Sequence, residues 1–143
     1  MGMFARYVEE SKRTIVRAKH EADSFGSLEI EPEHILLSLL SDSVLIRRTM
    51  ERSSAEGIRK TINAHLPRRE PNTLPHDLPL SGAAREALVL AEEEADKLNH
   101  RSIENGHLLL GLLESGDSFA SVLLMKEGLS ADQLRRQLET SSS

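Results

Sequence analysis

The sequence contains no cysteine and no tryptophan, and its 143 residues include one tyrosine and three phenylalanines. Without cysteine the chain cannot form disulfides, thiolate metal sites, iron–sulfur clusters or a cysteine nucleophile. With 3% aromatic residues it lacks the rings on which single-stranded nucleic acid stacks. Charged residues begin at Arg6 and recur through Arg17, so no apolar run near the start resembles a signal peptide or membrane span. We therefore expect a cytoplasmic location and no membrane partner.

The composition of the sequence is typical of a charged chain that forms helices. Hydrophobic residues make up 38% of the sequence and charged residues 29%, which is typical of a helical protein rich in Ala, Leu and Glu. The net charge of −5 lies in the second half, where residues 80–143 hold six lysines and arginines against eleven acidic residues. Such a surface repels phosphate backbones, so we expect no nucleic-acid partner and favour partners that are basic.

The chain contains an internal repeat. Shifted by 73 residues, positions 11–40 match positions 84–113 at twelve of thirty places without a gap, and His34 falls on His107. After residue 41 the offset becomes 76, because the first copy is three residues shorter there. A match of this length indicates two copies of one structural unit.

A proline-rich segment at residues 67–79 separates the two copies, with a proline at every fourth position. A helix cannot run through it, because each proline ring removes an N–H donor and clashes with the preceding turn. We therefore divide the chain into a first repeat at 3–66, an extended linker of limited flexibility at 67–79, and a second repeat at 80–140. Each repeat is small and poor in aromatics, so the two are expected to pack on each other as one globular domain.

The periodicity of apolar residues predicts four helices in each repeat. The second helix of each, at 35–40 and 108–113, is apolar on nearly every side and must lie at the centre of its bundle. The first helix of each has one apolar stripe, in which two of four residues are alanine, and a charged outer face. The third and fourth helices are predicted at 45–51 and 55–66, and at 119–126 and 131–139. The predicted fold class is all-α: two four-helix repeats with pseudo-twofold symmetry that form one eight-helix globule.

Capping residues predict where several helices begin. Pro32 suits the first position of a helix, and Asn105 suits an N-cap at the same place in the second repeat. The segment Ser130-Ala131-Asp132-Gln133 has the capping-box pattern, and Ser53-Ser54-Ala55-Glu56 is a second example in the first repeat. Both boxes precede a predicted fourth helix.

Two segments resemble a known family. Glu33-His34-Ile35-Leu36-Leu37-Ser38-Leu39-Leu40 and its counterpart at residues 105–113 resemble the helix that opens Gly-Thr-Glu-His-Ile-Leu-Leu-Gly-Leu in each copy of the Clp N-terminal double repeat of ClpC/ClpA-type unfoldases. The segments at 4–7 and 78–81 are also similar, and the resemblance covers about residues 3–140. It implies an eight-helix module that captures substrates and adaptor proteins for an attached ATP-driven ring.

No nucleotide-binding motif accompanies this resemblance. The nearest match to a phosphate-binding loop runs from Gly111 to Ser118, with Asp117 where the lysine is required. An acidic group there would repel phosphate, so we expect no cofactor, no ATP hydrolysis and no enzymatic activity from this chain.

The resemblance also implies a candidate ligand contact at Glu33. In Gram-positive relatives this module recognises phosphorylated arginine, and the glutamate of the Glu-His pair in each copy holds the guanidinium. Here Pro32 stands where the family has threonine, and the second repeat has Gly106 in place of the glutamate. Any phosphoarginine or substrate contact is therefore expected in the first repeat alone. The alternative, which we favour, is that Glu33 is a surface acid that complements the helix dipole.

His34 and His107 are predicted to be structural residues at a helix junction, each donating to a backbone carbonyl. Neither has a second metal ligand four residues away, so no metal site is predicted. Glu92, Glu93 and Glu94 are most simply a solvated helix face, and their functional alternative is an acidic docking strip for a basic adaptor. Arg47-Arg48 could pair with that strip or face solvent.

These features predict a monomeric, non-catalytic protein-binding module that recognises substrates or adaptor proteins, with a Clp-type unfoldase as a further partner. One alternative is a stand-alone regulator that competes with an unfoldase N-terminal domain for adaptors. Another is a small hydrolase built on Glu33 and His34. Helix geometry argues against it, because neighbours on a helix point about 100° apart and no serine completes a triad in the sequence.

Overall fold

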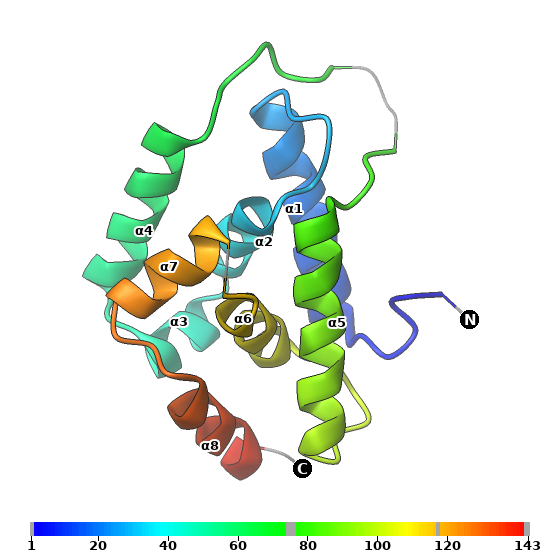
Figure 1. Cartoon of the computed structure of the whole chain (residues 1–143), viewed down its shortest axis with the longest axis vertical. Helices are drawn as coiled ribbons and strands as arrows, with labels where there is room; N and C mark the ends of the chain where they lie inside the picture. The colour runs from blue at the N-terminus through cyan, green and yellow to red at the C-terminus, as the bar shows by residue number, and fades with distance from the viewer. Residues whose placement is uncertain (1, 74–76, 117, 142–143) are drawn as a thin grey trace.

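The computed structural model describes residues 2–73, 77–116 and 118–141, which form eight helices (Figure 1). The helices of the first repeat are α1 (Glu9–Ser24), α2 (Pro32–Leu39), α3 (Ser43–Thr49) and α4 (Arg52–His65). Those of the second repeat are α5 (Gly82–Lys97), α6 (Asn105–Glu114), α7 (Phe119–Lys126) and α8 (Ala131–Ser141). The predicted all-α class with two four-helix repeats is confirmed.

The two long helices, α1 and α5, end in equivalent turns. After α1, Gly26 adopts a φ of 69°, and after α5 the equivalent Asn99 adopts a φ of 60°. Glycine and asparagine are the residues that tolerate this left-handed backbone best. The turn reverses the chain, so that α2 packs against α1 and α6 packs against α5.

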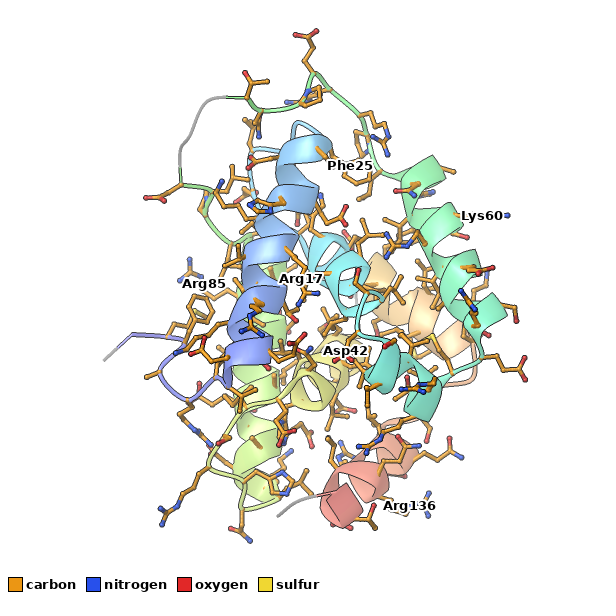
Figure 2. The ribbon with its side chains drawn as sticks, turned by 180° about the vertical axis from the view of Figure 1, so that it is seen from behind. Arg17, Phe25, Asp42, Lys60, Arg85 and Arg136 are labelled. Atoms are coloured by element: carbon orange, nitrogen blue, oxygen red, sulfur yellow. The ribbon has the colours of Figure 1, made fainter. Side chains whose placement is uncertain are left out.

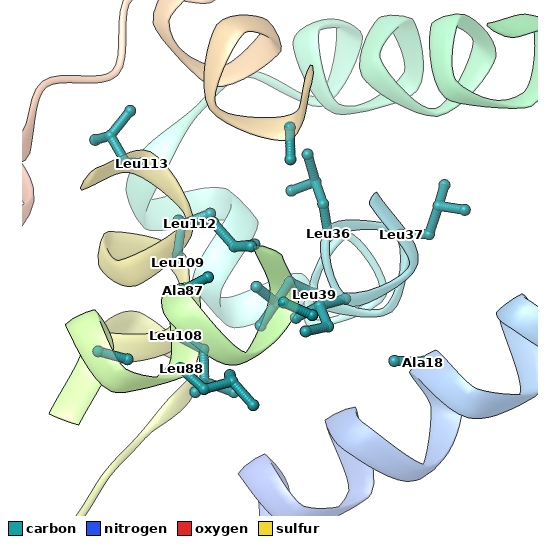
Figure 3. Close-up of a cluster of buried hydrophobic side chains, with 14 of the residues drawn as sticks. Ala18, Leu36, Leu37, Leu39, Ala87, Leu88, Leu108, Leu109, Leu112 and Leu113 are labelled. Atoms are coloured by element: carbon teal, nitrogen blue, oxygen red, sulfur yellow. The ribbon is translucent and has the colours of Figure 1, made fainter. Parts of the chain in front are cut away.

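The helices α2 and α6 form the centre of the molecule. Every residue of α2 is buried, and so is every residue of α6 from Asn105 to Leu113. Their leucines meet the small buried alanines of the long helices, such as Ala18 and Ala87 (Figure 3). At Gly111 a side chain would collide with the backbone of α5, so this glycine permits the close approach of α5 and α6. The sequence prediction of two central apolar helices is confirmed.

The pseudo-twofold symmetry is visible in two reciprocal backbone bridges between the repeats. Ahead of α1 the N–H of Val8 donates to the carbonyl of Ile103 at 3.1 Å, and the N–H of Ile103 donates to the carbonyl of Arg6 at 2.9 Å. The equivalent bonds ahead of α5 run from the N–H of Ser81 to the carbonyl of Ile30 at 3.0 Å, and from the N–H of Ile30 to the carbonyl of Pro79 at 2.8 Å. Each repeat thus supplies hydrogen-bond partners that the other needs, which joins them into one body.

Two predicted helix starts in the first repeat are wrong. Helix α3 begins at Ser43, where the side chain of Asp42 accepts a hydrogen bond from the N–H of Leu45 at 3.1 Å. Helix α4 begins at Arg52, a turn before the predicted start, so Ser53 lies inside the helix and does not cap it. The matching cap in the second repeat is present, because Ser130 Oγ accepts from the N–H of Gln133 at 3.1 Å.

The start of α6 also differs from the prediction. Asn105 is the first helical residue, as Pro32 is in α2, and Glu104 is the N-cap. The Glu104 side chain accepts from the backbone of His107, while the His107 ring accepts from the N–H of Glu104. The asparagine is therefore free to contact other helices.

The described part of the linker follows the end of α1 before it crosses to α5 (Figure 1). The N–H of Arg69 donates to the carbonyl of Phe25 at 2.9 Å, and the N–H of Asn72 donates to the carbonyl of Asp23 at 2.9 Å. The guanidinium of Arg68 lies 4.3 Å from the centre of the Phe25 ring, a cation–π contact. Leu74, Pro75 and His76 of the predicted linker, and Asp117 of the rejected phosphate loop, lie outside the described residues.

Candidate functional site

Glu33 lies in the first turn of α2, but its side chain turns inward. It is 8% exposed, and its Oε2 accepts a hydrogen bond from the backbone N–H of Ala120 at 3.2 Å. Ala120 belongs to the first turn of α7, so a carboxylate of the first repeat satisfies a helix N-terminus of the second. Burial raises the pKa of Glu33, and so does the nearby charge of Glu31, against a lowering by the Ala120 hydrogen bond. The interpretation of Glu33 as a surface acid is therefore wrong.

A cavity of about 400 Å³ opens beside Glu33, between the α1–α2 turn and the start of the linker. Its apolar lining includes Phe25 and Leu66, and its charged lining comprises Glu29, Glu31, Glu33 and Arg69. Carboxylates and a guanidinium thus line one hollow of side-chain size. Such a lining can hold a group that carries both charge signs.

The equivalent position in the second repeat is more closed, with a smaller hollow of about 150 Å³ lined by Gly106 and Leu138 among others. A Cβ added to Gly106 would lie 2.5 Å from Cδ2 of Leu138, so a leucine of α8 occupies this space. Beside it, Asn105 Nδ2 donates to Asp42 Oδ2 at 2.9 Å, and Thr14 Oγ1 donates to Asn105 Oδ1 at 2.9 Å. The second repeat therefore replaces the Glu33 carboxylate with an apolar contact and a buried amide.

The two histidines occupy the same place in the two repeats. His34 Nδ1 accepts from the N–H of Glu31, and His107 Nδ1 accepts from the N–H of Glu104, both at 2.9 Å. The prediction that each ring donates to a carbonyl is wrong, because the open N–H at the N-cap needs an acceptor. The pKa of each ring is lowered to about 4, by burial for His34, and by burial together with the nearby charges of His100 and Arg6 for His107. Nδ1 of His100 lies 2.9 Å from Nε2 of His107.

This geometry bears on the hydrolase alternative. The ring nitrogen of His34 on the N-cap side is already bound by a backbone N–H, and the carboxylate of Glu33 is bound by Ala120. Because Nδ1 of His34 accepts from a backbone N–H, the neutral ring carries its proton on Nε2 and has no open lone pair with which to act as a general base.

Glu92, Glu93 and Glu94 do not form one exposed acidic strip. Glu94 is 2% exposed and binds Arg135 through both oxygens, with Nε to Oε1 at 2.8 Å and Nη2 to Oε2 at 3.1 Å. Glu92 pairs with Arg6 at 3.6 Å, and Glu93 is exposed. The docking-strip hypothesis is wrong in this form, because one of its three carboxylates is buried in an internal ion pair.

Arg135 is a residue that the sequence analysis missed. It also lies 3.4 Å from Glu114 and 2.9 Å from Asp132, and its hydrogen bonds to Glu94 lower the pKa of that carboxyl. The network ties α8 to α5 and to the end of α6. The offset of 76 that aligns Arg59 with Arg135 could have pointed to it.

Among the described residues, no group of three or more histidine and acidic side chains has an arrangement that could hold a metal ion. In the same part of the chain, no single helix is long and apolar enough to cross a membrane, although the bent pair of α6 and α7 reaches that length and composition together.

Comparison with protein families decides what these repeats are. The model of the Clp repeat (R) N-terminal domain matches twice, at residues 6–84 and 79–143. The chain belongs to the Clp repeat N-terminal domain family. The resemblance of helices α2 and α6 to the corresponding helix of Clp N-terminal repeats is confirmed.

Relatives of this Clp repeat domain include much longer proteins. The negative regulator of genetic competence ClpC/MecB of Bacillus subtilis is 30% identical over 95% of this chain, which spans 17% of that protein. An uncharacterized protein of Mycobacterium tuberculosis is 32% identical over 80% of this chain, which spans 45% of that protein. The chain thus covers less than half the length of either relative.

Solved structures share the fold of this Clp repeat domain. A chain from an investigation of a malarial protein secretion system superposes with a TM-score of 0.83 at 25% identity, covering 96% of this chain and 97% of that one. The ClpV N-domain in complex with a VipB peptide gives a TM-score of 0.71 at 20% identity, covering 95% of this chain and 86% of that one.

Proposed function

We propose that this chain is a non-catalytic protein-binding module that receives substrates or adaptor proteins for a Clp-type unfoldase. The observation that carries the proposal is the family match across both repeats. Two further observations support it: the ClpV N-domain was solved with a bound peptide, and cavities of side-chain size open on the first repeat. Glu33 and His34, the residues nearest to a catalytic pair, are bound in structural contacts.

The test is a pull-down with the immobilised chain from a lysate of the cells that make it, with bound proteins identified by mass spectrometry. Beads that carry the chain after irreversible heat unfolding are the control. We expect adaptors or substrates of a Clp protease to be enriched on the folded chain. Equal recovery on both kinds of bead would contradict the proposal.

A stand-alone regulator is a second candidate, and the lengths of the relatives favour it. The aligned region makes up 17% of the Bacillus relative but 45% of the mycobacterial one, so the latter is less than half as long. Clp repeats therefore occur in relatives of very different lengths. In a reconstituted unfoldase–protease reaction, a competing module slows degradation of an adaptor-dependent substrate as it is added, whereas a module without that role leaves the rate unchanged.

A phosphoarginine contact at Glu33 belongs to the same proposal. The Glu33 cavity offers carboxylates for a guanidinium and Arg69 for a phosphate, although Pro32 lacks the backbone donor that threonine would supply. We expect at most one phosphoarginine per chain by calorimetric titration. Binding should be lost in Glu33→Ala and kept in Glu104→Ala, and two equivalent sites would contradict this assignment.

A further inference from the structure

A second hollow lies on the first repeat, away from Glu33, between α3, α4 and the end of α2. Its volume is about 520 Å³, within the range of sites that hold small ligands or a few side chains. Its apolar lining is Leu40, Ile46, Met50 and Ala55. Its charged lining is Arg47, Arg52, Arg59 and Glu56. We call it the α3–α4 groove. It combines an apolar surface with three guanidinium groups and one carboxylate.

The arginines of the α3–α4 groove are weakly engaged by the protein itself. Arg59 Nη2 donates to the carbonyl of Leu37 at 3.2 Å, and Arg47 Nε donates to the carbonyl of Ser43 at 3.4 Å. Arg52 lies 3.6 Å from Glu56, but its side chain is 93% exposed, so that pair contributes little. Within the described residues, no carboxylate lies within ion-pair distance of Arg59 or Arg47.

The second repeat shows what the position of Arg59 can bind. Its equivalent, Arg135, holds three carboxylates of this chain: Glu94, Glu114 and Asp132. The corresponding positions in the first repeat are Glu21, Ser41 and Glu56, and none of them forms an ion pair with Arg59 in the described structure. The first repeat thus keeps acids at two of these three positions but pairs neither of them with Arg59, whereas all three acids of the second repeat lie within ion-pair distance of Arg135.

We propose that the α3–α4 groove binds a protein segment in which an apolar side chain lies next to an acidic one. The carboxylate binds Arg59, and the apolar side chain packs on Leu40, Ile46 and Met50. Charge complementarity selects this occupant, because the groove has three cations and one anion on its rim. The inference rests on the proposed function and specifies one chemical class of segment that the module receives.

The test uses the full chain and two short fluorescein-labelled peptides. One peptide carries two leucine–glutamate pairs separated by glycine and serine, and the other has glutamine in place of each glutamate. Fluorescence anisotropy at low salt measures both affinities for the wild type, for Arg59→Gln, and for Arg85→Gln as the matched control. Arg85 is exposed on α5, away from α3 and α4 (Figure 2).

We expect the wild type to bind the glutamate peptide at least about tenfold more tightly than the glutamine peptide, the size expected of a hydrogen bond between charged groups. Arg59→Gln should remove that preference and leave the affinity for the glutamine peptide unchanged. Arg85→Gln should behave as the wild type. Equal affinity of the wild type for both peptides, or a preference that survives in Arg59→Gln, would overturn the proposal.

A second variant separates binding from folding, because Arg59 also bonds to Leu37. Arg47→Gln with Arg52→Gln changes two exposed side chains, so the melting temperature should stay constant while affinity for the glutamate peptide falls about threefold or more. An unchanged affinity would argue against the groove. Sedimentation of the wild type tests whether a second copy of the chain occupies the groove. Self-association that Arg59→Gln abolishes would assign the groove to that second copy and overturn the proposal.

The outcomes distinguish this inference from the proposed function. If the pull-down recovers adaptors or substrates and the glutamate peptide does not bind, the groove assignment fails and the function stands. If the peptide binds through Arg59 and the pull-down is empty, the groove stands and the Clp role fails.

Discussion

Arg59 and Arg135 occupy equivalent positions in the fourth helices of the two repeats, yet they have different surroundings. Arg135 is bound to three acidic side chains of the second repeat, whereas Arg59 faces a groove in the first. Glu33 and Gly106 also have different surroundings, since Glu33 lines a cavity of about 400 Å³ and Gly106, which lies under Leu138, lines a hollow of about 150 Å³. At these two positions the backbone is the same and the surroundings differ: the second repeat binds its arginine and covers its glycine with its own side chains, and the first leaves Arg59 and Glu33 beside larger hollows.

Substitutions in the core should have the largest effects on the free energy of unfolding. These effects should also differ least between the two repeats. Leu37 and Leu110 are equivalent and fully buried. Replacing either with alanine removes packed methyl groups and leaves a cavity, which should lower the free energy of unfolding by about 2–5 kcal/mol. Urea denaturation of both variants measures this. A negligible loss for one of them would show that the two central helices are not equivalent.

The buried histidines should make both repeats sensitive to acid. The pKa of His34 and of His107 falls from 6.5 to about 4 on folding, so the unfolded state takes up protons first. The stability they contribute is fully present above pH 6.5 and is lost as the pH falls to about 4, by roughly 3 kcal/mol for each ring.

Two single variants, His34→Asn and His107→Asn, keep an acceptor for the N-cap and remove the titration. Denaturation at a series of pH values should show that each variant loses about the same part of the pH dependence between pH 6.5 and 4. A slope that matches the wild type in both variants would mean that the rings are protonated in the folded protein.

The matched arginines should differ in their contribution to stability. Arg135→Met leaves the buried carboxylate of Glu94 without its main partner and should lower the free energy of unfolding by about 2 kcal/mol. This is below the range for fully buried pairs, because the Arg135 side chain is 30% exposed. Arg59→Met should cost less than about 1 kcal/mol, since it removes one hydrogen bond at an exposed groove. Equal losses of stability in the two variants would show that Arg59 and Arg135 are held equally by the protein, which would contradict the difference between the repeats.

The last substitution should stabilise the protein by a small amount, whereas the others lower the free energy of unfolding. Ser11 in α1 is fully buried, and its hydroxyl has no hydrogen-bond partner among the residues that the structure describes, whereas the equivalent residue in α5 is Ala84. Ser11→Ala should therefore raise the free energy of unfolding by about 1 kcal/mol. Thermal denaturation against the wild type measures the gain. A loss of stability would mean that the hydroxyl has a partner in solution.

The sequence alone predicted the parts of this fold that depend on local pattern. The repeat offset and the apolar runs identified eight helices and the two central ones, because burial on every side requires apolar residues at every position. The caps at Ser53 and Asn105 were predicted wrongly, since several residue types can begin a helix and the Glu104–His107 pair takes that role.

The candidate site was harder to predict, because its contacts join distant segments. Glu33 meets Ala120 only when α7 lies against α2, and no local pattern carries that information. Glu94 was open to prediction, since it lies between Ala91 and Ala95 of the predicted apolar stripe, where a carboxylate needs a buried partner. The offset alignment names Arg135 as the counterpart of Arg59, but the acids around it are visible only in three dimensions.

The most direct test of the central claim, that the α3–α4 groove of the first repeat receives protein segments while the second repeat pairs the equivalent arginine internally, is an NMR titration. Amide spectra of the isotope-labelled chain would be recorded as the leucine–glutamate peptide is added. The account predicts that shifts concentrate on α3, α4 and the end of α2, around Ile46, Met50 and Arg59. Shifts centred on α7 and α8, or none at saturating peptide, would contradict it.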